Sequence, residues 1–167
     1  AVFGFHATNL AIHLAAALAL FGLIRRTLVR PVLVEPLRTH ATPLALLVAL
    51  LWVVHPLQTE SVTYLIQRAE SLMGLFYIGA LYAFARGTTA GGARWFAAAV
   101  LAAWGGAATK EVAAAIPLLA LLYDRTFVAG TFRAAWQARR GVHLALMSAW
   151  LLSALLVGDL FGVSALV

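Results

Sequence analysis

Three short polar stretches interrupt an apolar chain, and they hold most of the side chains that could do chemistry. Residues 55–61 read HPLQTES, residues 109–111 read TKE, and residues 158–159 read GD. The ammonium group of Lys110 can bind a carboxylate or a phosphate as a point charge. Glu60, and Glu70 further along the chain, can pair with a cation, exchange a proton or help to hold a metal ion. These turns therefore contain the first candidate site residues.

A second set of polar side chains follows residues 57–85, which we expect to form one helix. Glu60, Thr63, Tyr64, Gln67 and Ser71 fall within about 100° of one another on a helical wheel, with Arg68 and Glu70 on either side. The guanidinium of Arg68 can bind a phosphate or a carboxylate with two hydrogen bonds. The alternative is that Arg68 and the glutamates form an internal ion-pair network that holds helices together.

The Lys110-Glu111 pair has two interpretations as well. If a helix begins at Glu111, the helix dipole favours its carboxylate in the first turn, and Lys110 is free to face an anionic ligand. The alternative is a charged hairpin tip without a ligand.

Histidines give a weaker signal. His6 and His13 are seven positions apart and so share a helix face with Asn9 near them. Ligation of haem or a pigment is conceivable there, but hydrogen bonds between helices are the commoner role. The sequence allows the same two roles for His55 and His143. We expect no metal site, because no spaced ligand signature is present, and the chain has no cysteine.

The amino-acid composition indicates the environment of these side chains. The 167 residues are 63% hydrophobic and 11% charged, with a mean hydropathy of +0.94. Soluble domains are typically about 45–50% apolar and about 25% charged. The excess apolar residues lie in runs bounded by arginines, as membrane spans do. The net charge of +6 therefore indicates membrane topology and not a nucleic-acid partner.

Six apolar helical segments are predicted, at residues 5–24, 43–54, 57–85, 95–108, 112–123 and 142–157. The second, fourth and fifth are too short to span a ~30 Å hydrocarbon core unaided, and the third is long enough for its first turns to leave it. Short helices are tolerated where they end in an aqueous cavity. The fourth and fifth could instead form one long helix with the Lys110-Glu111 pair buried near its middle. The predicted fold is all-α, a polytopic transmembrane bundle over a single domain, residues 1–167.

The distribution of basic residues predicts how this bundle is oriented in the membrane. Ten of the 12 basic residues fall in alternate connections: Arg25, Arg26, Arg30, Arg38, Arg86, Arg94, Arg125, Arg133, Arg139 and Arg140. The positive-inside rule places these connections in the cytoplasm. We therefore expect His55, Lys110 and Asp159 together on the opposite side.

Three sequence blocks resemble one family. Residues 4–10 (GFHATNL) with His13 look like the entry helix of the membrane domain in TPR-containing protein O-mannosyltransferases and their bacterial relatives. Residues 55–62 (HPLQTESV) and 68–72 (RAESL) are similar to that family's second block. Residues 109–112 (TKEV), Pro117 and the Tyr123-Asp124 pair resemble its third. Order and spacing agree over residues 4–124.

The resemblance implies a GT-C type glycosyltransferase that transfers a sugar from a polyprenyl-phosphate donor on the non-cytoplasmic side. By similarity, the donor cavity would contain His55, Glu60, Arg68, Glu70, Lys110 and Glu111. No further cofactor is expected, and the location would be a bacterial inner membrane.

The resemblance assigns no catalytic residue, because the family's acidic pair precedes the first helix and is not among these residues. We therefore expect this chain to be an internal piece of a longer protein. Its expected partners are membrane lipids, the polyprenyl-phosphate sugar and other membrane subunits. The main alternative is a non-catalytic accessory subunit of a larger membrane complex, respiratory or photosynthetic; a transporter or channel is a third.

Overall fold

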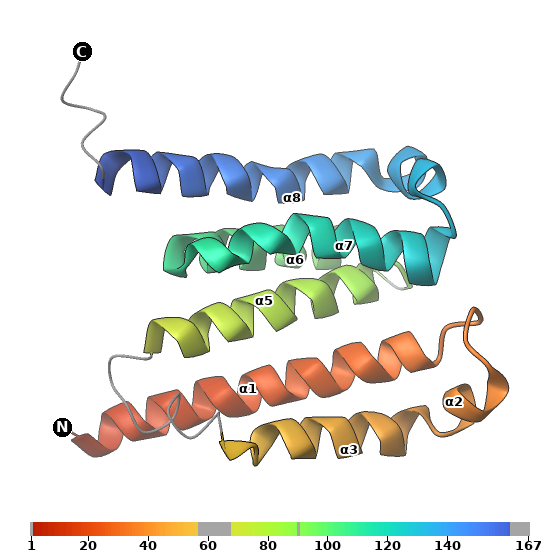
Figure 1. The fold of residues 1–167 in the computed structure, drawn as a ribbon, viewed down its shortest axis with the longest axis horizontal. Helices are drawn as coiled ribbons and strands as arrows, with labels where there is room; N and C mark the ends of the chain where they lie inside the picture. The colour runs from red at the N-terminus through yellow and green to blue at the C-terminus, as the bar shows by residue number, and fades with distance from the viewer. Residues whose placement is uncertain (1, 57–67, 90, 161–167) are drawn as a thin grey trace.

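The computed structural model describes residues 2–56, 68–89 and 91–160, and these form helices packed side by side, with no strand among them (Figure 1). In chain order the elements are α1 (Val2–Leu28), α2 (Glu35–Thr39), α3 (Ala41–Val53), α5 (Arg68–Gly87), α6 (Gly92–Thr109), the 3-10 segment η3 (Glu111–Ala115), α7 (Ile116–Asp124), the π-helical segment η4 (Arg125–Ala129) and α8 (Phe132–Leu160). The prediction of an all-α fold is confirmed.

Local sequence explains where these helices end. The His55-Pro56 dipeptide follows α3, where proline disfavours a helical conformation of the residue before it. Gly91 (φ 66°) before α6 and Gly130 (φ 79°) before α8 have left-handed backbones, which glycine adopts without a steric penalty. Lys110 has an extended backbone (φ −161°, ψ 143°) and ends α6. The alternative of one long helix through Lys110 is therefore wrong.

Several predicted boundaries differ from the structure. The fifth segment is continuous with its 3-10 and π-helical flanks over 19 residues, Glu111–Ala129, so the prediction that it is too short to span was wrong. The sixth follows a kink at Arg139 (φ −139°, ψ 28°), and the helical residues 132–138 before this kink, also part of α8, were not predicted. The short helix α2 lies in a predicted connector. The third segment is described only from Arg68 onward, so the remainder of its polar stripe lies outside the described residues.

The long helices alternate in direction, so their connections gather at two ends of the bundle (Figure 1). The connections α1–α3, α5–α6 and α7–α8 lie at one end, which contains Arg38, Arg94 and Arg133; we call this the arginine end. The α6–η3 turn with Lys110 and the C-terminal ends of α3 and α8 lie at the other, the lysine end. The predicted separation of the two groups of connections is confirmed for the described residues.

Two helical stretches among the described residues are long and apolar enough to cross a bilayer. They are His6–Leu28, with 23 residues, and Glu111–Ala129, with 19. The helix Ala41–Val53 is apolar but shorter, as predicted for the second segment.

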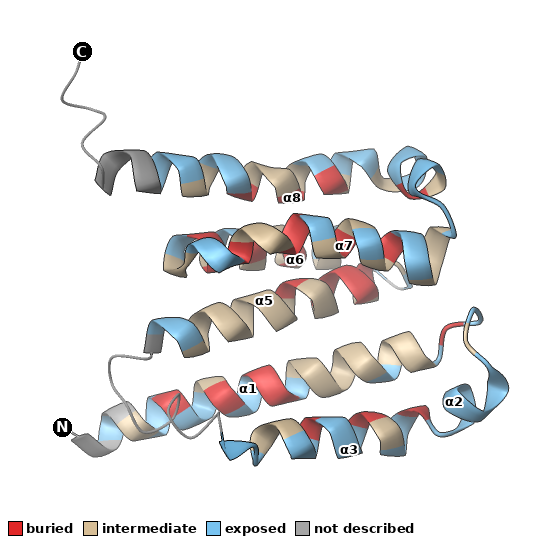
Figure 2. Cartoon of the chain, in the orientation of Figure 1, coloured by how far each residue is buried: buried red, intermediate tan, exposed pale blue. Residues whose placement is uncertain are grey.

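Small side chains line the interior of the bundle. Buried residues lie on the faces that the helices turn toward one another, and the outward faces of α3 and α8 are exposed (Figure 2). The core combines alanines from α5, α6, η3 and α7 with larger side chains at Phe84, Ile116 and Leu146. Alanine and glycine let helix backbones approach closely, which is how helices associate where water does not drive them together.

Two glycines provide contact surfaces for aromatic rings. A Cβ on Gly22 of α1 would lie 2.5 Å from the ring of Tyr82 on α5, and one on Gly105 of α6 would lie 2.8 Å from the ring of Phe76. The aromatic residues fill space that only a glycine leaves open. These glycines therefore set the spacing of α1 and α6 from α5.

A histidine joins α1 to α3. The ring of His13 stacks on Trp52 with 4.7 Å between centroids, and its Nε2–H donates to the carbonyl oxygen of Val53 at 3.2 Å. Of the two roles considered for this histidine, the structure contains the hydrogen bond between helices.

We expect Gly22→Leu to destabilise the bundle by about 1–3 kcal/mol, because the new side chain must displace the Tyr82 ring. Gly79→Leu is the matched control, since a Cβ on Gly79 meets no atom within 4 Å. Thermal unfolding in detergent should separate the two variants. Equal melting temperatures would contradict the close approach of α1 to α5.

Candidate functional site

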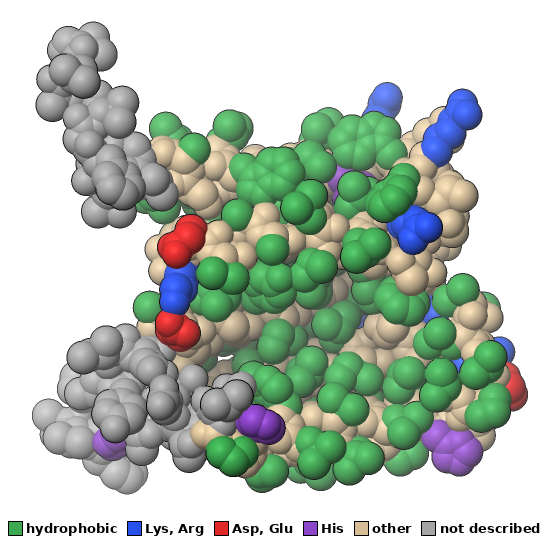
Figure 3. All heavy atoms as spheres, viewed as in Figure 1, with side chains coloured by type: hydrophobic (Ala, Val, Ile, Leu, Met, Phe, Trp, Pro, Cys, Tyr) green, Lys and Arg blue, Asp and Glu red, His purple; other side chains and the backbone are tan. Residues whose placement is uncertain are grey.

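The lysine end contains an ion pair formed by residues 40 positions apart. The Nζ of Lys110 donates to Oε1 of Glu70, in the first turn of α5, at 2.5 Å. The side chains are 35% and 52% exposed. Figure 3 shows acidic and basic side chains gathered at this end, over the start of α5 and the α6–η3 turn. The pair therefore sits at the surface, where an external ligand can reach both groups.

The backbone of the α6–η3 turn presents Lys110 to this surface. The Lys110 N–H donates to the carbonyl of Gly106 at 3.0 Å, and the Lys110 carbonyl accepts from the N–H of Ala113 at 3.1 Å. The Thr109 hydroxyl also donates to the Gly106 carbonyl, at 2.7 Å. The residue is thus held by its main chain on both sides, while its side chain extends outward.

Electrostatics keep Lys110 charged. The hydrogen bond to Glu70 and the attraction of that carboxylate raise the pKa of Lys110 above its ordinary value, and Glu111 adds to the effect. Glu111 is exposed and opens η3, where the positive end of a helix dipole favours an acidic side chain. The turn therefore offers one permanent cation between two carboxylates.

A small cavity of about 130 Å³ lies beside this turn. Its described lining residues come from the C-terminal ends of α6 and α8 and from the turn itself: Ala107, Ala108, Thr109, Lys110, Glu111, Ser153 and Leu156. The Oγ of Ser153 is buried and has no hydrogen-bond partner among the described residues. The cavity thus combines a cation, an acid and two hydroxyl groups, which suits a small polar or anionic group.

The six predicted site residues fall into three groups. Glu70, Lys110 and Glu111 lie together at the lysine end. His55 follows α3, is exposed, and is not among the described residues that line this cavity. Glu60 and the side chain of Arg68 lie outside the described part of the chain, although the backbone of Arg68 begins α5 two residues before Glu70. Their convergence on Lys110 stays a prediction.

Sequence reasoning did not identify a second polar cluster, at the arginine end. Asp124, the last residue of α7, is fully buried and accepts two hydrogen bonds from Arg139, at 2.7 Å from Nε and 2.5 Å from Nη2. Its Oδ2 also accepts from Nε2–H of His143 at 2.9 Å. The signal was present in the sequence, because Arg139 and His143 are four positions apart, and Asp124 is the single acid of α7.

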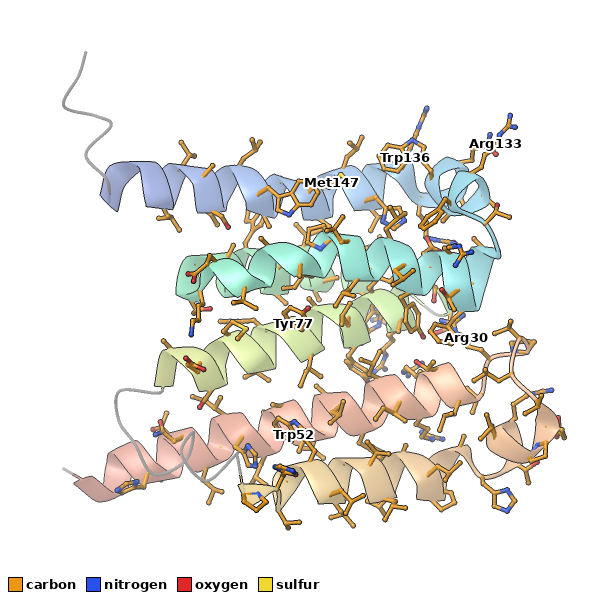
Figure 4. All side chains as sticks on the ribbon, viewed as in Figure 1. Arg30, Trp52, Tyr77, Arg133, Trp136 and Met147 are labelled. Carbon is orange, nitrogen blue, oxygen red and sulfur yellow. The ribbon has the colours of Figure 1, made fainter. Side chains whose placement is uncertain are left out.

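This cluster extends to α1 and α5 through Tyr123. The Tyr123 hydroxyl accepts from the Thr27 hydroxyl at 3.1 Å, and the Arg30 guanidinium lies 6.0 Å from the centre of its ring. Arg30 also donates to the Ala85 carbonyl at 3.0 Å and to the Thr88 hydroxyl. Figure 4 shows Arg30 between the ends of these helices, whereas Arg133 points away from the bundle. The arginine end is thus held by buried polar contacts.

No group of three or more histidine, cysteine or acidic side chains within the described ranges is placed to hold a metal ion. Comparison of the chain with protein-family models, with curated proteins and with solved structures finds no match.

We expect Asp124→Asn to destabilise the bundle by about 3 kcal/mol, because Arg139 and His143 lose the carboxylate that neutralises a buried site. The matched control is Glu35→Gln at the exposed Arg38–Glu35 pair, whose glutamate is 73% exposed. That change should stay within about 0.5 kcal/mol. Chemical unfolding in detergent compares the two, and equal effects would contradict a supporting role for Asp124.

The Lys110–Glu70 pair makes a separate prediction about pH. Because the folded state raises the pKa of Lys110 above its ordinary 10.5, the stabilisation by this pair is present below pH 10.5 and is lost as the pH rises through the folded value. The difference in melting temperature between wild type and Lys110→Gln, which is small because the pair is exposed, should be constant near neutral pH and decrease only above pH 10.5. A difference that already decreases between neutral pH and pH 10.5 would mean that the pKa of Lys110 is not raised.

Proposed function

We propose that this chain is a membrane domain of a polyprenyl-phosphate-sugar-dependent glycosyltransferase of GT-C type. The observation that carries the proposal is the meeting of Glu70 and Lys110, from two of the three resembling sequence blocks, beside a small polar cavity at the lysine end. A phosphate-linked sugar needs a cation for its phosphate and hydrogen-bonding groups for its hydroxyls. This cavity offers both.

The bundle is proposed to lie in a bacterial inner membrane and to cross it about six times. Support comes from the apolar composition, from two helical stretches of sufficient length, and from large apolar side chains on outward faces. Leu18, Leu151 and Leu155 are 71%, 69% and 68% exposed, which water would disfavour and lipid would not.

Placement in the inner membrane also orients the bundle. With the arginine end in the cytoplasm, the lysine end faces outward. A lipid-linked donor on that side would reach Lys110 with its phosphate at the level of the α6–η3 turn. The chemistry would then take place on the non-cytoplasmic side, in agreement with the family that the sequence resembles.

The donor phosphate is proposed to replace Glu70 as the partner of Lys110. The ion pair is surface-exposed, and exposed pairs contribute little to stability because water screens them. Exchange of one anion for another at Lys110 therefore requires little reorganisation. Arg68, in the same first turn as Glu70, would add a bidentate contact to the phosphate. The residues available assign a donor site and no catalytic base.

An accessory subunit is the second candidate, and one observation favours it. Lys110 already has a partner in Glu70, and the buried Asp124 cluster joins helices without any ligand. A purely structural role would need nothing more. The two candidates differ in what Lys110 does for ligand affinity.

Replacement of Lys110 separates the two functions. We expect Lys110→Gln to weaken binding of a polyprenyl phosphate mannose by about 10- to 100-fold, the loss typical of one hydrogen bond to a charged group, with little change in melting temperature. Arg133→Gln, at the opposite end, is the control and should leave affinity unchanged. Unchanged donor affinity in Lys110→Gln together with a clear fall in melting temperature would favour the accessory subunit.

A further inference from the structure

An apolar groove between α6 and α8 has no role in the proposed donor site. It has a volume of about 420 Å³ and only apolar lining residues: Phe96, Ala97, Val100, Leu101, Trp104, Gly141, Val142 and Ala145. A cavity of roughly 150 Å³ already binds benzene in an engineered protein. The groove is thus large enough for a stretch of hydrocarbon chain.

The groove runs toward the arginine end. Its lining residues belong to the first two thirds of α6 and to the part of α8 just after the Arg139 kink. Toward the lysine end, the indole N–H of Trp104 donates to the Ser148 hydroxyl at 2.9 Å and joins the two helices. This contact lies between the groove and the Lys110 cavity along both helices, so the groove is distinct from the candidate donor site.

A basic side chain lies at the other end of the groove. Arg94 precedes Ala97 and Leu101 by three and seven positions, and so continues the α6 stripe that lines the groove. Arg94 is exposed, and its Nε would lie 3.0 Å from a Cβ on Gly91, which places the guanidinium over the first turn of α6. The groove therefore joins an apolar wall to a cation at the surface of the bundle.

We propose that this groove binds one acyl chain of an anionic phospholipid, whose phosphate pairs with Arg94. The inference rests on the proposed membrane location but not on the transferase activity. Charge favours this occupant, because the arginine end concentrates basic side chains and a guanidinium binds phosphate with two hydrogen bonds. A partner helix fits less well, since a groove of this size holds the volume of about one helical turn.

Native mass spectrometry from detergent tests the site, with phosphatidylglycerol and phosphatidylcholine added in turn. Wild type should retain one phosphatidylglycerol and bind it about tenfold more tightly than phosphatidylcholine, a difference of about 1.4 kcal/mol. Gly141→Leu should abolish retention by filling the groove, because a Cβ there meets no atom within 4 Å and the longer side chain has room. Ala97→Leu fills it from the α6 wall and serves if Gly141→Leu does not fold. Arg94→Gln should remove the preference for phosphatidylglycerol.

Matched controls define the result that would overturn the proposal. Gly79→Leu and Arg133→Gln introduce the same changes elsewhere and should leave lipid binding unchanged. Retention in both groove-filling variants, or an equal effect of Arg94→Gln and Arg133→Gln, would overturn it. Alkaline extraction of membranes tests the location separately: a chain that stays in the membrane but retains no lipid rejects only this inference. A chain that is extracted rejects the membrane location as well.

Discussion

The buried carboxylate of Asp124 is the charge on which the arginine end depends. An isolated carboxylate in an apolar interior would be strongly disfavoured, and here Arg139 and His143 supply three hydrogen bonds to it. To do so, α8 must bring its first turns against the end of α7, and the kink at Arg139 accommodates this geometry. Tyr123, the neighbouring residue, extends the cluster to Thr27 and Arg30 of the α1 region. One charge thus aligns the helices at this end.

The ion pairs at the two ends of the bundle differ in how far they are buried. Asp124 is fully buried and its partners are fixed, so removing one member would leave others uncompensated. Glu70 and Lys110 are 52% and 35% exposed, so water can replace either partner. A site that must exchange an internal carboxylate for a ligand needs the second kind of pair. This difference, more than the identity of the residues, is why the donor proposal centres on the lysine end.

Small residues determine both the packing and the openings between helices. Gly22 and Gly105 admit the rings of Tyr82 and Phe76, and these contacts set the distances of α1 and α6 from α5. Between α6 and α8, the small residues Ala97, Gly141 and Ala145 line a groove that remains open. Small residues therefore take part in both arrangements: close contacts where a ring packs on a glycine, and a groove where α6 and α8 leave space between them.

The sequence by itself determined the helical class, the approximate segments and the separation of basic connections from the lysine end, because hydropathy and charge are local properties of the chain. It missed the helical residues of α8 before the Arg139 kink and the full length of Glu111–Ala129, since 3-10, π-helical and kinked turns carry no clear apolar period. Only the tertiary structure paired Asp124 with Arg139 and His143, and Lys110 with Glu70. These pairs join residues 15 to 40 positions apart, and they depend on how each helix is rotated and shifted against its neighbours. Side-chain packing sets that rotation, and no single segment encodes it.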